Sequence, residues 1–178
     1  MKKKCRDRIP ILGFSGYANV GKTTLIEQLV VLFKKRGLQV AVIKHHPHGK
    51  AEVDQAGTDS WKFTQAGADI SLIASPKRIA LIEQRIRTFS ELVAMIQDVD
   101  LILVEGFKRE SIVQIGVCRR EVNQQFPAPL DRYIAVVSDQ EVGEADIPRF
   151  HFDQIDLLGD FILQALAEGR LERGKEQP

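Results

Sequence analysis

The chain contains few cysteines, no long apolar run and no surplus of either charge. Its 178 residues include only two cysteines, Cys5 and Cys118, which lie too far apart for a disulfide framework or a zinc finger. We therefore expect free thiols in a reducing compartment, which favours a cytoplasmic protein. No apolar stretch approaches the roughly 18 residues of a membrane-spanning helix, so an integral helical membrane protein is not expected.

The charge balance argues against a nucleic-acid-binding protein. Lys and Arg number 25 against 24 Asp and Glu, which gives a formal net charge of +1. A nucleic-acid-binding protein normally carries a basic surplus, so no nucleic-acid partner is expected. The lysines at positions 2–4 precede only a short apolar stretch at 9–14, which is too short for a secretory signal.

The chain does contain a regular alternation of apolar strands and amphipathic helices. The strands are expected at 9–15, 39–44, 70–74, 78–83, 101–104, 112–117 and 133–137. Helices are expected to begin at Gly21, near Thr58, after Thr88 and at Asp153, with Trp61 and Phe63 in the core. Continuously apolar strands between helices indicate a three-layer α/β fold, with a mostly parallel central sheet and helices on both faces. We expect one domain over 1–178, with flexible tails at 1–8 and from about 169.

The most specific motif is a P-loop between the first strand and the first helix. It matches G-x-x-x-x-G-K-[ST], and backbone N–H groups of such a loop surround phosphate oxygens. Lys22 is expected to reach the β- and γ-phosphates, and the Thr23 hydroxyl to bind Mg²⁺. These residues predict a P-loop NTPase-like fold and a nucleotide site made of Gly16, Tyr17, Ala18, Asn19, Val20, Gly21, Lys22, Thr23 and Thr24.

A second element is the strand 101–104, which has an acidic residue at each end. Glu105 follows the strand at its carboxyl end, the sheet edge at which the P-loop lies, and is expected to hold Mg²⁺ or its water. Asp100 precedes the strand, so it is expected at the opposite edge in a structural role. We take Lys22 and Glu105 as the candidate catalytic residues.

Two polar segments leave alternatives open. The sequence from Lys44 to His48 follows the second strand, where it could bind a metal, contact the nucleotide as a switch-like loop, or remain solvated. Asp59 could cap a short helix or contact the magnesium ion.

A guanine-reading carboxylate is expected at Asp139, which stands at the end of the apolar strand that begins at 133. Its carboxylate could accept from N1–H and the 2-amino group of guanine, which adenine cannot match. The full Asn-Lys-x-Asp motif is absent, so this residue only favours guanine. Lys108, Arg109, Arg119 and Arg120 could line an anionic-ligand groove or form a solvated face.

The sequence resembles the molybdopterin-guanine dinucleotide biosynthesis adaptor proteins, the MobB family. The resemblance covers nearly the whole chain apart from the two tails. It rests on the segments Gly16–Thr24, Ile43–His46, Gly57–Ser60 with Ala66–Ala68, and Leu101–Lys108 with Asp131–Arg132 and Ser138–Asp139. The segment from Val104 to Lys108 is far more specific than the P-loop, which many unrelated families share.

The resemblance implies a homodimeric GTP-binding protein with weak Mg²⁺-dependent GTPase activity, an adaptor more than an enzyme. It implies assistance to the molybdenum cofactor guanylyltransferase that joins GMP to molybdopterin, and handling of GTP, molybdopterin or its guanine dinucleotide. Two other functions stay open from the residues: a P-loop kinase of a small molecule, and a GTP-dependent metallochaperone that uses the histidines from His45 to His48.

Overall fold

The computed structural model describes residues 9–46, 54–122, 125–141 and 146–171. The chain divides into two compact units, which we describe separately. The first unit contains the residues up to His45 and from Ile96 onward, and the second contains 46–95. The expectation of one domain over the whole chain stays a prediction.

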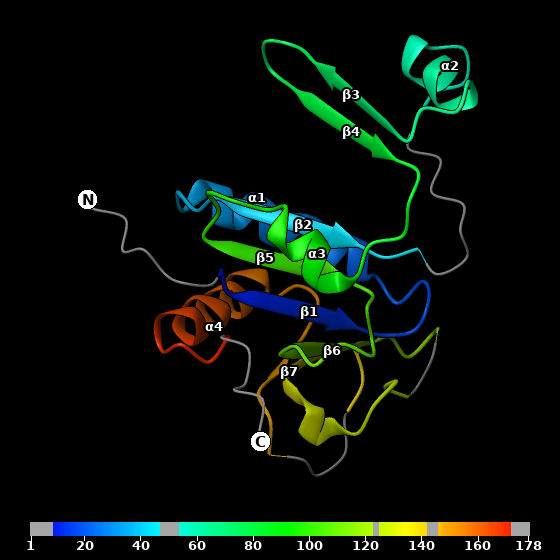
Figure 1. Ribbon diagram of the computed structural model, residues 1–178. Coiled ribbons are helices and arrows are strands. Elements are labelled where there is room, and N and C mark those ends of the chain that lie inside the picture. Colours follow the sequence, from blue (N-terminus) through cyan, green and yellow to red (C-terminus); the bar gives the residue numbers. More distant parts are fainter. Residues whose placement is uncertain (1–8, 47–53, 123–124, 142–145, 172–178) are drawn as a thin grey trace, which may run out of the picture. The chain divides into compact units, whose positions relative to one another are not determined.

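The first unit is built on a six-stranded sheet in which every pair of neighbouring strands is parallel. The strand order is β2-β5-β1-β6-β7-β8, and the arrows of β1 and β2 point the same way in Figure 1. Its strands are β1 (Ile11–Ser15), β2 (Val40–Lys44), β5 (Leu101–Glu105), β6 (Gln114–Cys118), β7 (Tyr133–Ser138) and β8 (Arg149–Phe150). The expected α/β fold with a mostly parallel central sheet is confirmed.

Two long helices pack on one face of this sheet. They are α1 (Lys22–Lys35) and α4 (Ile155–Ala167), which contact each other and share one hydrophobic core with the strands. Leu29 and Phe33 of α1 and Ile162 of α4 are completely buried in that core. Over β6 and β7, a second small cluster forms around Tyr133 and Val136 and is covered by the segment 126–130.

The parallel register fixes which residues meet at each edge of the sheet. At the amino ends, Asp100 accepts a hydrogen bond from the N–H of Gln39 at 2.7 Å, which confirms its structural role. At the carboxyl ends, Lys44 of β2 stands beside Glu105 of β5, and Phe14 of β1 stands beside Glu105 on the other side. The polar residues that end β2 and β5 therefore lie beside the end of β1, where the P-loop begins.

The second unit is a hairpin with two short helices. It contains α2 (Asp59–Gln65), β3 (Ile70–Ala74), β4 (Ile79–Glu83) and α3 (Phe89–Ala94). The strands β3 and β4 pair antiparallel in a two-stranded sheet of their own. The sequence showed the two strands but not this separation, because a hairpin and a parallel pair have the same apolar composition here.

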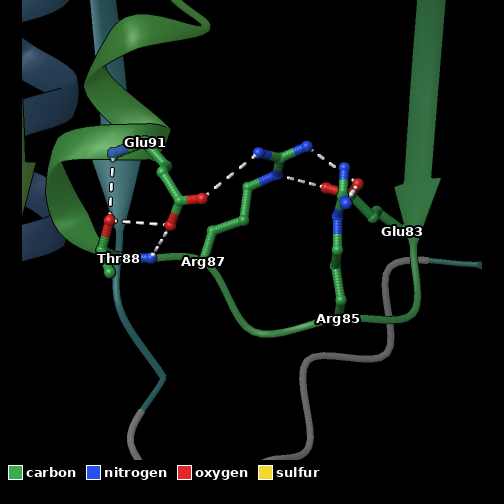
Figure 2. Close-up of polar contacts among 5 residues, drawn as sticks. All are labelled: Glu83, Arg85, Arg87, Thr88 and Glu91. Atoms are coloured by element: carbon green, nitrogen blue, oxygen red, sulfur yellow. Dashed lines mark hydrogen bonds and ion pairs between the residues drawn. The ribbon is translucent and has the colours of Figure 1, made fainter.

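A polar network joins the end of β4 to the start of α3 (Figure 2). Glu83 accepts hydrogen bonds from Arg87, one of them at 2.8 Å from Nη2, and pairs with Arg85. The guanidinium of Arg87 is the main cause that lowers the pKa of Glu83. Thr88 and Glu91 form the expected capping box: the Thr88 hydroxyl accepts from the N–H of Glu91, whose carboxylate accepts from the N–H of Thr88.

Several local expectations need correction. Phe63 is exposed and Trp61 is only partly buried, so neither lies in a core; α2, to which both belong, contains no buried residue. The last helix begins at Ile155 with Gln154 as its N-cap, while Asp153 pairs with His151. Leu171 is buried and accepts a backbone hydrogen bond from Ile11, so the ordered chain continues past 169; the expected tails at 1–8 and 172–178 lie outside the described residues. No helix in the described ranges has the length and hydropathy to cross a membrane.

Candidate nucleotide-binding site

The P-loop connects the end of β1 to the start of α1 and has the backbone shape that its glycines predict. Gly16 is buried so closely against the carbonyl oxygen of Val117 that a Cβ would overlap it. Asn19 and Gly21 both have left-handed backbones, with φ values of 63° and 93°. Val20 is completely buried and attaches the loop to the core, whereas Tyr17, Ala18 and Asn19 are exposed. The exposed part of the loop is therefore open toward a ligand.

The Lys22 side chain folds back over the loop. Its Nζ donates to the carbonyl oxygens of Gly16 at 3.1 Å and Tyr17 at 2.6 Å. Partial burial is the main cause that lowers the pKa of this ammonium, with Lys44 and Lys108 acting in the same direction and Glu105 opposing them. An anion bound in the loop would offset that unfavourable environment.

Glu105 and Thr23 meet at the mouth of the loop, as the sequence predicted. The Thr23 hydroxyl donates to the Glu105 carboxylate, with Oγ1 lying 2.9 Å from Oε2 and 3.0 Å from Oε1. Lys44 completes the group, since its Nζ lies 3.2 Å from Thr23 Oγ1 and 3.4 Å from Glu105 Oε2. A hydroxyl and a carboxylate are ligands that Mg²⁺ accepts, and a cationic ammonium already contacts both. This donor set fits a magnesium ion.

The turn after Glu105 is tightly built. Gly106 and Phe107 have left-handed backbones, with φ values of 98° and 51°. A Cβ on Gly106 would lie 2.8 Å from the Cβ of His45. The Phe107 and His45 rings stack with their centroids 4.4 Å apart, and the His45 N–H donates to the Glu105 carbonyl. These contacts hold the ends of β2 and β5 together and so fix where Lys44 and Glu105 stand.

Asp139 lies at the carboxyl end of β7, where the sequence predicted it. Its Oδ1 accepts a hydrogen bond of 2.8 Å from the backbone N–H of Arg120. This contact orients the carboxylate from the loop that follows β6. No sequence pattern marks this donor, because a backbone N–H is available at any residue except proline.

Two further cations lie beside the P-loop. The Arg119 guanidinium stacks over the Phe152 ring at 4.1 Å from its centroid, and both groups lie close to Gly21. The Lys108 ammonium lies 5.3 Å from the centre of the Tyr17 ring. Sequence reasoning named both cations as possible ligand contacts but had no signal for the aromatic rings that hold them.

The remaining candidate site residues have no described side-chain contact with Lys22, Thr23 or Glu105. Asp59 is the first residue of α2 and pairs with Lys62 at 3.2 Å, while Thr58 is the N-cap that accepts from the Trp61 N–H. Thr24 and His46 are exposed, and His48 lies outside the described residues. Within the described ranges, no three His, Cys, Asp or Glu side chains are grouped as a metal site would need. The metallochaperone and kinase alternatives stay untested.

Comparisons with known proteins agree on one family. The family model of MobB, molybdopterin guanine dinucleotide synthesis protein B, matches residues 11–139. A molybdopterin-guanine dinucleotide biosynthesis adapter protein of Haemophilus influenzae is 36% identical over 160 residues, which cover 88% of this chain and 89% of the relative. The adapter protein of the same description from Escherichia coli is 32% identical over 164 residues, with 88% and 93% covered. The crystal structure of Bacillus subtilis MobB is similar with a TM-score of 0.75 at 26% identity, covering 88% of this chain and 97% of that one.

Proposed function

The chain belongs to the MobB family, and on this premise we propose that it is a GTP-binding adaptor of molybdopterin guanine dinucleotide biosynthesis. In this proposal it assists the guanylyltransferase that attaches GMP to molybdopterin. The observation that carries the nucleotide part is the meeting of Lys22, Thr23 and Glu105 at one edge of the parallel sheet. The adaptor part is supported by the relatives, whose descriptions name that role.

The phosphates would be bound by the P-loop backbone and by Lys22. The two carbonyl oxygens that now accept from Lys22 are weak partners compared with phosphate oxygens, which carry charge. When a triphosphate enters, the ammonium exchanges those carbonyls for the β- and γ-phosphates. The lowered pKa of Lys22 supports this role, because it reflects a site that disfavours an uncompensated cation.

Magnesium would be held by the Thr23 hydroxyl and, directly or through water, by Glu105. When bound, the ion neutralises charge on the phosphate oxygens. Glu105 is fixed by its hydrogen bond with Thr23 and by the register of β2 and β5, so it can orient water near the terminal phosphate. Asp59 belongs to the second unit, where it pairs with Lys62, and it is not assigned to the ion in this proposal.

The base would be guanine, read by Asp139. Oδ1 already accepts from Arg120, and a carboxylate oxygen can accept a second hydrogen bond, so both oxygens can serve the N1–H and 2-amino groups. Hydrolysis would be slow. No water-orienting glutamine or arginine finger is assigned among the described residues, and such groups accelerate GTPases by roughly 10³–10⁵.

Partners of this proposal are a second copy of the chain and the guanylyltransferase, with molybdopterin or its guanine dinucleotide as a possible further ligand. The homodimer is supported by the second unit, where β3 and β4 are both edge strands of a two-stranded sheet. Their exposed aliphatic side chains form a patch of the kind that protein interfaces cover. It consists of Ile70, Leu72, Ile79 and Leu81, which the strand register places on one face of the hairpin.

A nucleotide titration tests the proposal. Wild type should bind GTP with magnesium more tightly than ATP, and Lys22→Ala should lose roughly 100-fold in GTP affinity, because charge-assisted hydrogen bonds to phosphate are lost. Lys35→Ala, which removes an exposed lysine at the far end of α1, is the matched control and should bind normally. Unchanged affinity in Lys22→Ala would refute the P-loop site. Equal affinity for ATP and GTP would refute only the proposed role of Asp139. A pterin ligand in the same titration series tests whether the protein also binds molybdopterin.

A further inference from the structure

Lys44 stands in the position that the proposed magnesium ion requires. It is the last residue of β2, and the parallel register places it directly beside Glu105. The backbone hydrogen bond from the His45 N–H to the Glu105 carbonyl, 2.9 Å long, holds the strand ends in that register. The Lys44 ammonium contacts the same two groups, Thr23 Oγ1 and the Glu105 carboxylate, that would bind the ion.

An ammonium and Mg²⁺ cannot share these groups. Magnesium needs its oxygen ligands at about 2.0–2.1 Å, in a nearly octahedral arrangement. The ammonium donates to the same oxygens, and its positive charge would repel the ion at this short range. Any magnesium ion that binds Thr23 must therefore displace Lys44 first.

The charges around the loop indicate where the displaced side chain goes. Lys44 and Lys108 both act to lower the pKa of Lys22 at the P-loop, and Glu105 is the acidic group that opposes them. Three ammonium groups against one carboxylate leave a positive surplus, which suits a triphosphate that keeps negative charge after binding magnesium. The Lys44 side chain is 41% exposed and attached to a fixed strand end, so it can turn toward the phosphates without movement of the backbone.

We propose that Lys44 is a resident cation of the magnesium position, which Mg²⁺ displaces only together with a nucleotide, and which then binds the terminal phosphate. This proposal rests on the proposed nucleotide site but assigns a residue that the P-loop motif does not contain. It predicts a fixed order of binding. In the nucleotide-free protein the Lys44 ammonium fills the magnesium position, and the divalent ion binds there together with the nucleotide.

The first experiment measures divalent binding without nucleotide. Free Mn²⁺ is followed by electron paramagnetic resonance in wild type, Lys44→Met, Lys44→Arg and Lys35→Met. Removal of the competing charge in Lys44→Met should raise Mn²⁺ affinity about tenfold, while the other two variants stay at the wild-type value. Adding Glu105→Gln to Lys44→Met should abolish the gain, which places the bound ion at this site. Equal Mn²⁺ affinity in wild type and Lys44→Met, or no binding in either, overturns the resident-cation role.

The second experiment tests where the side chain goes. With magnesium present, Lys44→Met should weaken binding of the non-hydrolysable triphosphate analogue about tenfold and that of the diphosphate less than twofold. Lys44→Arg should restore most of the triphosphate affinity. Equal losses for both nucleotides overturn the contact with the terminal phosphate. If wild type binds neither nucleotide, the proposed function fails, and the Mn²⁺ measurement still decides on the resident cation by itself.

Discussion

The two units contain equally aliphatic strands but bury them in opposite ways. In the first unit, Leu103 of β5 is completely buried between strands on both sides and beneath the helices. In the second unit, Leu72 of β3 is 63% exposed and Ile79 of β4 is 74% exposed. Among the described residues of that unit, only Ser71 and Phe89 are buried.

The difference shows two sources of stability in one chain. The first unit depends on buried apolar surface, which stabilises a domain in proportion to its area. The second has short helices and a two-stranded sheet, which is marginally stable alone, so it depends on capping and ion pairs such as those of Glu83 (Figure 2). The proposed phosphate site lies in the first unit, where buried strands hold its geometry, and the exposed aliphatic patch lies in the second.

The largest expected effect is a core truncation in the first unit. Leu103→Ala should lower the free energy of unfolding by about 3 kcal/mol, because it removes completely buried methyl groups and leaves a cavity. The matched change Leu72→Ala should stay within about 0.5 kcal/mol at low protein concentration. Urea unfolding followed by circular dichroism measures both. Similar losses would show that the hairpin is buried in solution, and repetition at higher concentration would reveal whether a second copy covers it.

A glycine pair compares how far each unit tolerates an added methyl group. Gly106→Ala should lower the free energy of unfolding by about 2–3 kcal/mol, because the new side chain would combine a left-handed backbone with a Cβ 2.8 Å from that of His45. Gly57→Ala in the second unit has a similar φ of 90° but no described atom within 4 Å, so it should cost about 1 kcal/mol from strain alone. Thermal unfolding gives both values. A Gly57→Ala cost equal to that of Gly106→Ala would rule out the contact as the cause of the difference.

A capping substitution should act on the second unit alone. Thr88→Ala removes both the N-cap hydroxyl and the reciprocal capping box of α3, at a cost of about 1 kcal/mol. Amide hydrogen exchange should accelerate in α3 and remain unchanged in β1 and β5. Thr64→Ala is the control in the same unit, because its hydroxyl only donates to the Ser60 carbonyl within α2. Faster exchange throughout both units would contradict their separate stabilities.

The smallest effect is an acid-dependent loosening near Glu83. The Arg87 guanidinium, and Arg85 beside it, lower the pKa of Glu83 below its ordinary value of 4.5. A lowered folded-state pKa means that this stabilisation is complete above about pH 4.5 and is lost as the pH falls through the folded value. Exchange of the amides between Glu83 and Thr88 should therefore accelerate in acid. Glu83→Gln should remove that part of the pH dependence; an identical acid profile in Glu83→Gln would contradict the role of this carboxylate.

Much of the candidate site could be predicted from spacing alone. The P-loop motif and an acid after an apolar strand must meet at one edge, because parallel strands all end there. Thr23 and Glu105 are in contact because, in addition, β1 and β5 are neighbouring strands. Lys44 was placed near the same edge, but its pairing with both residues depends on β2 and β5 being neighbours, which the strand order alone decides.

The sequence by itself determined the alternation of elements, the P-loop backbone, the capping box of α3 and the family, because each depends on residues close together in the chain or on a direct match. Only the tertiary structure decided that β3 and β4 form a sheet of their own, and that the Lys44 ammonium contacts oxygens of both Thr23 and Glu105. It also decided that the Arg119 guanidinium stacks over the Phe152 ring. The physical reason is the same in each case. The type of a side chain determines which kinds of group it can contact, and the arrangement of the strands determines which of those groups lie beside it.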